Sequence, residues 1–254
     1  MNFYRDFIKK LYFRHAAGDS DPQAMNLDNW AGQYFGRYLL RCEQNMLGRG
    51  CGELAGYRLM HLGVSGDGSG LEPFKQLHQF YIRPSAQPLQ FESSSAVGAY
   101  AELPLPSEVV DVAVLQHALE YSASPQAVLA ETARVLAPGG HLILCVINPL
   151  GPIGLIKSLM GLFLRRPEYG FHSLRKRRVY DWLSLLNFQV VGVNNGAYNL
   201  PLERPDWLQK DSVWEQTCQK IHFPLGNFYM IHAVKRVAGG IRNTAPAWRA
   251  VGEQ

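Results

Sequence analysis

Residues 109–149 read VVDVAVLQHALEYSASPQAVLAETARVLAPGGHLILCVINP, and this stretch decides the fold. It opens with a β-branched apolar run from Val109 to Leu115, which only Asp111 interrupts. It closes with a second run from His141 to Ile147, which is apolar over Leu142 to Ile147. Runs of this kind predict strands that are buried on both faces of a sheet.

Residues 125–136 join the two runs and repeat apolar side chains at helical spacing. Pro125 suits the first position of a helix, where no amide hydrogen is needed, and the Pro-Gly-Gly sequence at residues 138–140 is expected to end that helix. Two parallel strands joined by one crossover helix form a βαβ unit. The sequence therefore predicts an α/β fold of the doubly wound class.

Weaker patterns flank this unit on both sides. Residues 1–14 and 29–47 have the apolar spacing of helices, and Asp28 with Asn29 can cap the second of them. The other predicted elements are short strands and one helix: strands at 58–64, 77–82, 89–91, 189–193 and 227–234, and a helix at 179–186.

Composition indicates one globular domain with short additions. The chain has 254 residues, 47% of them apolar, which suffices for a sizeable core. Its four cysteines include no Cys-x-x-Cys pair, so we expect neither a disulfide framework nor a metal site. No apolar run reaches the ~18 residues that a membrane-spanning helix needs. We therefore expect a cytoplasmic protein that is soluble or attached to a membrane only peripherally.

The stretch 109–149 also resembles part of the class I S-adenosylmethionine (SAM)-dependent methyltransferases, the group that carries a methyltransferase type 11 domain. The resemblance rests on His117, Leu119 and Glu120 after the first strand, on RVLAPGG at residues 134–140, and on the Asn-Pro pair at residues 148–149. It implies a Rossmann-like fold with a mostly parallel seven-stranded sheet, helices on both faces and an antiparallel last strand.

The same resemblance implies a division of the chain into three parts. Residues 1–54 would form an N-terminal helical cap. Residues 55–237 would form the Rossmann-like methyltransferase domain, with a lid insertion at residues 150–178. Residues 238–254 are poor in apolar side chains and are expected to form a flexible tail.

In this family a glycine-rich turn after the first sheet strand approaches SAM closely, and a Cβ atom there would block the contact. The usual pattern is an acid, one apolar residue and Gly-x-Gly-x-Gly, and the matching text here is HLGVSGDG at residues 61–68. His61 stands in place of the acid, Gly63 matches the first glycine, and Ser65 replaces the second, with Gly66 beside it. The resemblance implies that these four residues bind the cofactor.

Further cofactor contacts are expected along the chain. Tyr100 stands where the family contacts the adenine, and Gln116 is expected to contact the methionine portion. His117 lies at the sheet edge where open α/β sheets bind ligands. It is an expected cofactor contact and the candidate catalytic group, and the alternative is a structural histidine bonded to a loop. The second strand lacks the acid that holds the ribose in the family, and Arg83 follows it instead.

The insertion combines an apolar segment with a basic one. Residues 153–164 are strongly apolar and include one lysine. Residues 165–178 carry six basic side chains and one glutamate, a local charge of +5. One interpretation is a lid over the substrate, which we favour. The other is an element at residues 153–178 that contacts an anionic membrane surface. We expect no specific nucleic-acid partner, because the sequence has no recognition-helix motif.

Two functions of different classes are compatible with these features. The first is a SAM-dependent methyltransferase that moves a methyl group to a small-molecule or lipid-like acceptor under the lid. The second is a catalytically inactive binding or regulatory protein that kept the fold and lost the cofactor, which the altered glycine turn favours. We favour the enzyme, because the 109–149 unit is intact and a scaffold would not need a lid.

Overall fold

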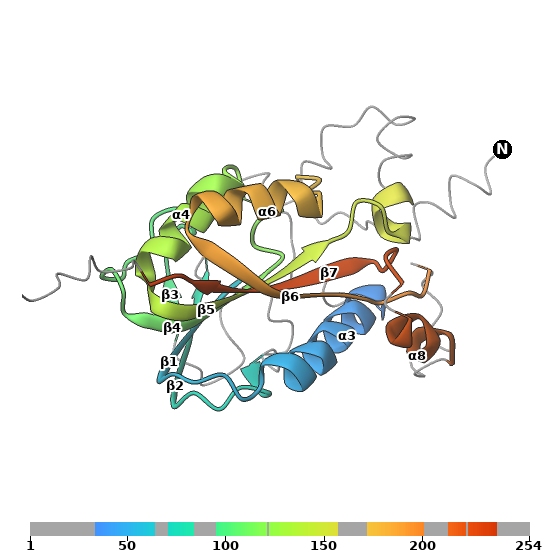
Figure 1. The fold of residues 1–254 in the computed structure, drawn as a ribbon, viewed down its shortest axis with the longest axis horizontal. Coiled ribbons are helices and arrows are strands. Elements are labelled where there is room, and N and C mark those ends of the chain that lie inside the picture. The colour runs from blue at the N-terminus through green and yellow to red at the C-terminus, as the bar shows by residue number, and fades with distance from the viewer. Residues whose placement is uncertain are drawn as a thin grey trace, which may run out of the picture.

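The computed structural model describes residues 34–63, 71–83, 95–120, 122–156, 172–200, 213–221 and 223–237. These residues form one seven-stranded sheet with helices on both faces (Figure 1). The elements are, in chain order, α3 (Tyr34–Cys51), β1 (Arg58–Gly63), β2 (His78–Arg83), β3 (Ser95–Val97), β4 (Val110–Gln116), α4 (Pro125–Val135), β5 (Leu136–Ile147), α6 (Lys176–Leu185), β6 (Phe188–Gly196), α8 (Val213–Lys220) and β7 (Phe228–Lys235).

The strands follow the order β3-β2-β1-β4-β5-β7-β6 across the sheet. Only β7 runs against the others, since it pairs antiparallel with both β5 and β6. The predicted Rossmann-like sheet, mostly parallel with an antiparallel last strand, is confirmed. Because parallel strands share a direction, β1, β4 and β5 end at one edge of the sheet, called the carboxyl edge below.

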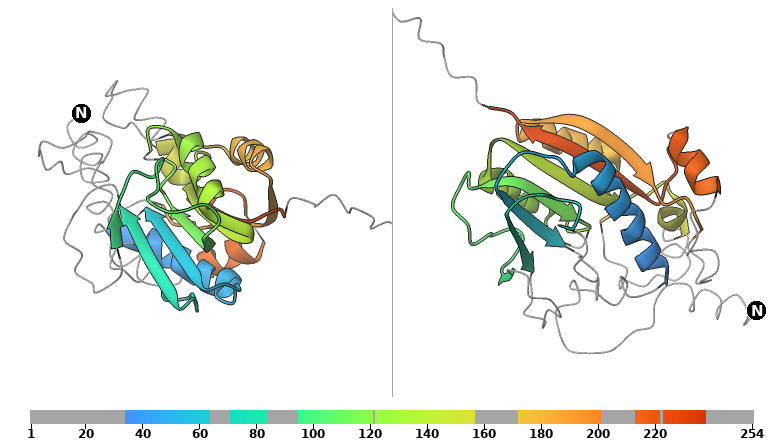
Figure 2. Two further views of the ribbon diagram at one scale, coloured as in Figure 1. Left: turned by 90° about the vertical axis from the view of Figure 1, so that its left-hand side faces the viewer. Right: turned by 90° about the horizontal axis from the view of Figure 1, so that it is seen from below.

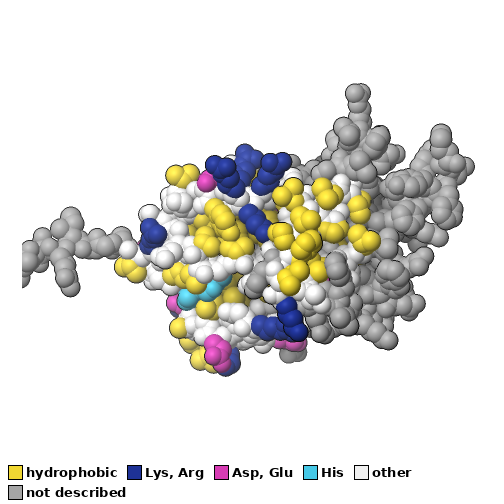
Figure 3. Space-filling view, turned by 45° about the vertical axis from the view of Figure 1, so that its right-hand side comes forward, with side chains coloured by type: hydrophobic (Ala, Val, Ile, Leu, Met, Phe, Trp, Pro, Cys, Tyr) yellow, Lys and Arg dark blue, Asp and Glu magenta, His cyan; other side chains and the backbone are white. Residues whose placement is uncertain are grey.

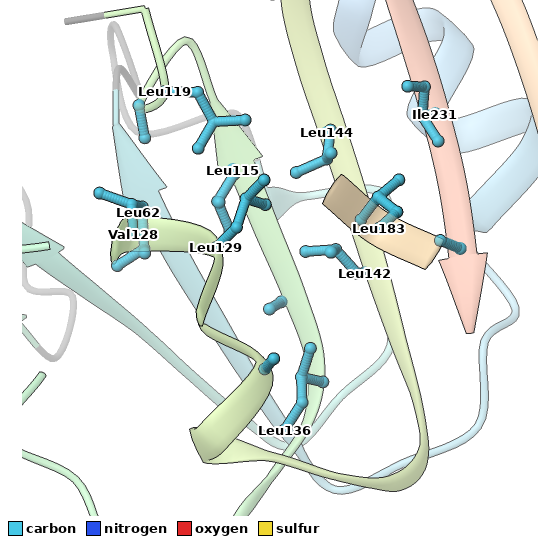
Figure 4. Packing of buried hydrophobic residues seen from close by; sticks show 14 of the residues in the cluster. Leu62, Leu115, Leu119, Val128, Leu129, Leu136, Leu142, Leu144, Leu183 and Ile231 are labelled. Atoms are coloured by element: carbon cyan, nitrogen blue, oxygen red, sulfur yellow. The ribbon is translucent and has the colours of Figure 1, made fainter. Parts of the chain in front are cut away.

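Helices α4 and α6 cover one face of the sheet, and α3 lies on the other (Figures 1 and 2). Under α4 and α6, the side chains of Leu62, Leu115, Leu129 and Leu144 form part of one fully buried cluster (Figure 4). Each side chain of this kind contributes roughly 1.5–3 kcal/mol when it leaves water. The two apolar runs of the sequence are thus strands in the middle of this core, as predicted.

The opposite face is covered by α3, which comes before β1 in the chain. Its apolar side chains recur at helical spacing, and Leu39 and Leu47 pack in the same buried cluster as Leu59 and Val114 of the sheet. In the described part of the β1–β2 connection, residues 71–77, the chain forms turns. The predicted helix at 29–47 is therefore confirmed over Tyr34 to Leu47, and it continues to Cys51.

The prediction that β5 begins at His141 was wrong, because it begins at Leu136, directly after α4. The Pro-Gly-Gly sequence lies inside β5 as a bulge: Val110 pairs with Leu136, and two residues later Val112 pairs with His141. Gly139 has a φ of +79° in this bulge, a conformation that glycine adopts without strain.

Asp111, the polar residue within the first apolar run, has a structural task. Its carboxylate accepts hydrogen bonds from the backbone N–H groups of Tyr57 and Arg58, at 2.8 Å and 2.8 Å. It thereby fixes the beginning of β1 against β4.

Other parts of the fold differ from prediction or lie outside the described residues. The third strand is at Ser95–Val97, whereas the predicted 89–91 lies outside the described part, and α8 was not predicted. The predicted helix at residues 1–14, the tail at 238–254 and residues 157–171 of the insertion also lie outside it. Among the described helices, none combines the length and the apolar character needed to cross a membrane.

Candidate functional site

The ends of β1 and β4 touch at the carboxyl edge. Gly63 is paired with Gln116, and it has a φ of +109°. A Cβ atom built on Gly63 would lie 1.9 Å from the carbonyl oxygen of Gln116. The first glycine of the predicted motif is therefore required by a close approach of two strands.

The chain turns sharply directly after β4. His117 has a φ of +56°, which is uncommon for a residue with a side chain. Its backbone N–H donates to the carbonyl oxygen of Cys145 at 2.9 Å, so the turn is fixed to β5. This geometry directs the His117 side chain toward α3.

A carboxylate from α3 meets this turn inside the protein. Glu43 is fully buried, and its Oε2 accepts a hydrogen bond of 2.5 Å from the side-chain amide of Gln116. Its Oε1 lies 2.9 Å from Nε2 of His117, and both side chains of this ion pair have no exposed surface. Glu43 thus binds two consecutive residues at the end of β4.

A second carboxylate lies on the other side of the His117 ring. Oε1 of Glu120 is 3.2 Å from Nδ1 of His117 and accepts a hydrogen bond of 2.5 Å from the backbone N–H of Ile147. The Glu120 carbonyl also accepts the N–H of His172, at 2.7 Å. Glu120 therefore connects the turn after β4 with the end of β5 and the segment before α6.

These two carboxylates decide the charge of His117. Burial lowers its pKa, but the charge of Glu43 and the hydrogen bonds to Glu120 and Glu43 outweigh burial and raise the pKa of His117 to about 10. The ring is therefore an imidazolium at neutral pH. In that state both nitrogens carry hydrogen, so neither has a lone pair to accept a proton.

His61 is the neutral histidine of the same site. Burial and, to a smaller extent, the charge of Arg83 lower the pKa of His61 to about 4, and the hydrogen bond to Gln116 only partly offsets them. Nε2 of His61 is 3.1 Å from Oε1 of Gln116. Since the Gln116 amide nitrogen donates to Glu43, its oxygen accepts, and His61 must donate. The residue that replaces the family's acid is thus linked to a carboxylate through Gln116.

Tyr100 reaches the same place from the loop after β3. Its hydroxyl oxygen accepts a hydrogen bond of 3.0 Å from the backbone N–H of Gly63. The contact holds the last residue of β1 where the glycine-rich sequence begins.

We expect Tyr100→Phe to lower the free energy of unfolding by about 1 kcal/mol, because the Gly63 N–H loses its partner in a partly buried position. Urea unfolding would measure the change. Tyr57→Phe is the matched control, since the Tyr57 side chain is 57% exposed. Equal stability of the two variants would show that the Tyr100 hydroxyl contributes nothing.

The structure brings together all the predicted site residues that it describes: His61, Gly63, Tyr100, Gln116 and His117. Ser65 and Gly66 lie outside the described residues. The sequence reasoning missed Glu43, although one signal was present. It stands midway between Leu39 and Leu47 on the buried face of α3, where a carboxylate requires a partner.

The comparisons with known proteins concern the domain and the fold. Residues 50–144 match a family model that describes a methyltransferase domain. The uncharacterized protein YafS of Escherichia coli is 27% identical over 164 residues, which are 65% of this chain and 66% of YafS, just under two thirds.

Solved structures show the same fold. A SAM-dependent methyltransferase of Thermotoga maritima matches with a TM-score of 0.64 and 17% identity, covering 84% of this chain and 97% of that one. A geranyl diphosphate methyltransferase in complex with SAM matches with a TM-score of 0.51 and 18% identity, covering 87% of this chain and 93% of that one. Residues 50–144 are thus similar to a methyltransferase domain, and the described residues share the fold of SAM-dependent methyltransferases.

Proposed function

We propose that the protein is an active methyltransferase that takes a methyl group from SAM and moves it to a small or lipophilic acceptor. One observation carries the proposal: β1 and β4 meet at Gly63 and Gln116, at the edge where open α/β sheets bind ligands. The Glu43 network supports this meeting point from inside. The match of residues 50–144 to a methyltransferase domain supports an enzyme over an inactive scaffold.

The donor set fits the methionine portion of SAM better than the ribose. Gly63 ends β1 at the carboxyl edge, where open α/β sheets bind their ligands. The carboxylate of Glu43 accepts a hydrogen bond from Gln116, which in turn accepts one from His61. This carboxylate comes from α3, whereas the family's acid belongs to β1. At the end of β2 the chain has Arg83, a residue that cannot accept a hydrogen bond from ribose hydroxyls. The proposal therefore rests on the β1–β4 side of the site.

Bound SAM would supply a methyl group already activated on a sulfonium, so the protein mainly has to align the acceptor and exclude water. We propose that His117 serves this task as a positioning residue. As an imidazolium between Glu43 and Glu120 it fixes the turn at residues 117–120. It has no lone pair with which to deprotonate an acceptor.

Calorimetric titration with SAM and S-adenosylhomocysteine tests the proposal. We expect micromolar binding to the natural protein and none to Gly63→Val, whose side chain enters the space next to Gln116, under conditions in which circular dichroism shows that this variant is folded. Gly50→Ala is the matched control, since nothing lies within 4 Å of a Cβ atom there. If the folded natural protein gives no binding heat at millimolar SAM, the proposal is refuted. Binding would justify a screen of cell extracts with methyl-labelled SAM to find the acceptor.

A further inference from the structure

Four leucines are exposed at the carboxyl edge, three of them on loops and Leu155 in the helical segment 152–156. Leu150, Leu155, Leu200 and Leu225 have exposed fractions of 53%, 54%, 55% and 41%. Figure 3 shows a face of the protein on which apolar side chains gather, with basic side chains along its margin. Single exposed leucines are ordinary, but a contiguous group of them marks a site of interaction.

Two buried asparagines hold these loops side by side. The side-chain amide of Asn148 donates to the carbonyl oxygens of Gly226, at 2.9 Å, and Pro224, at 3.1 Å. That of Asn227 donates to the carbonyl oxygen of Asn199, at 2.7 Å. The leucines therefore stand on segments that are fixed to one another, and we call these four leucines the leucine platform.

A basic cluster adjoins the leucine platform. Arg175, Arg177 and Arg178 are exposed where α6 begins. This end of α6 is attached to the same edge, because the Tyr229 hydroxyl donates to the carbonyl oxygen of Leu174 at 2.9 Å, and Lys176 bonds the side chain of Asn195.

The position of these arginines is unfavourable for the helix itself. A helix N-terminus carries partial positive charge and is stabilised by acidic side chains, yet the first turn of α6 has no acid. Three exposed cations here therefore oppose the helix dipole. An external anionic partner would compensate this cost.

We propose that the leucine platform and Arg175, Arg177 and Arg178 dock the protein on an anionic lipid bilayer. Leucines can enter the acyl boundary while arginines meet the headgroup phosphates. A nucleic acid would also attract the arginines, but it offers the leucines no apolar medium. Docking would turn the carboxyl edge toward the membrane. Docking would give a lipophilic acceptor access to the site, and this role rests on the proposed function. The docking itself does not depend on that function.

Co-sedimentation with vesicles tests the docking without any SAM. The full chain is mixed with vesicles of phosphatidylcholine alone, or of equal parts phosphatidylcholine and phosphatidylglycerol. We expect sedimentation with the anionic vesicles only. Each arginine contributes about fivefold in affinity, so Arg175→Gln, Arg177→Gln and Arg178→Gln together should weaken binding about a hundredfold. Leu150→Ser with Leu225→Ser should weaken it by at least tenfold.

Matched variants use the far side of the molecule. Arg49→Gln, Arg58→Gln and Lys75→Gln remove three exposed charges, the latter two at the opposite sheet edge, and Leu77→Ser with Leu185→Ser removes two exposed leucines. The triple charge variant and the double leucine variant should each bind the anionic vesicles as tightly as the natural protein does. Equal losses in the control and test variants, or no sedimentation at all, would overturn the docking. So would self-association that Leu150→Ser abolishes, or retention by nucleic acid but not by vesicles. A calorimetric response to SAM remains an independent result.

Discussion

Gly63→Ala is expected to lower the free energy of unfolding by about 2–6 kcal/mol, because two penalties add at this residue. A side chain at a φ of +109° is strained whatever surrounds it. In addition, the new Cβ atom would lie 1.9 Å from the Gln116 carbonyl oxygen, which belongs to the backbone of a central strand and cannot rotate away. Urea unfolding at neutral pH would measure the loss.

Two other glycines separate these penalties. Gly139 has a φ of +79° but nothing within 4 Å of a Cβ atom, so Gly139→Ala carries only the strain, about 1–2 kcal/mol. Gly192 lies in β6 with no such neighbour and no positive φ. Gly192→Ala should leave stability unchanged or raise it by about 0.4–1 kcal/mol. If Gly63→Ala cost no more than Gly139→Ala, the close approach of β1 and β4 would not be what demands glycine.

The βαβ unit at residues 109–149 was predictable because its strands are buried on both faces. Such strands must be apolar almost throughout, and the pattern is visible without any knowledge of neighbours. The Pro-Gly-Gly sequence was harder to interpret. It marks the place where the helical pattern stops, but whether a turn or a strand bulge follows depends on the pairing of Leu136 with Val110, which is a long-range property.

The candidate site was predictable only in part, for a similar reason. The family pattern located His61, Gly63, Gln116 and His117. The residue that sets the charge of His117, Glu43, lies 73 positions before Gln116 and outside the matched domain. A histidine alone does not reveal its protonation state. That state follows from the carboxylates that the fold places around the ring.

The second large effect is expected from Glu43→Gln, which keeps the size of the side chain and removes its charge. At neutral pH the free energy of unfolding should fall by about 3–5 kcal/mol, because the buried imidazolium of His117 loses one of its two carboxylate partners. Glu53→Gln is the matched control: Glu53 is 89% exposed in its pair with Lys75, so a change of at most about 1 kcal/mol is expected. Similar losses in both variants would contradict a buried ion pair.

The pH dependence of this loss identifies the proton that is responsible. Histidine in the unfolded chain has a pKa near ~6.5, whereas the pKa of His117 in the folded protein is raised to about 10. A raised folded pKa gives stability that is complete below the unfolded pKa and is lost as the pH rises through the folded one. The difference between the natural protein and Glu43→Gln should therefore be greatest at or below pH ~6.5 and shrink steadily toward pH ~10. A difference independent of pH over this range would mean that His117 is neutral when folded. Its ring would then keep a lone pair, and His117 would become a candidate general base instead of a positioning residue.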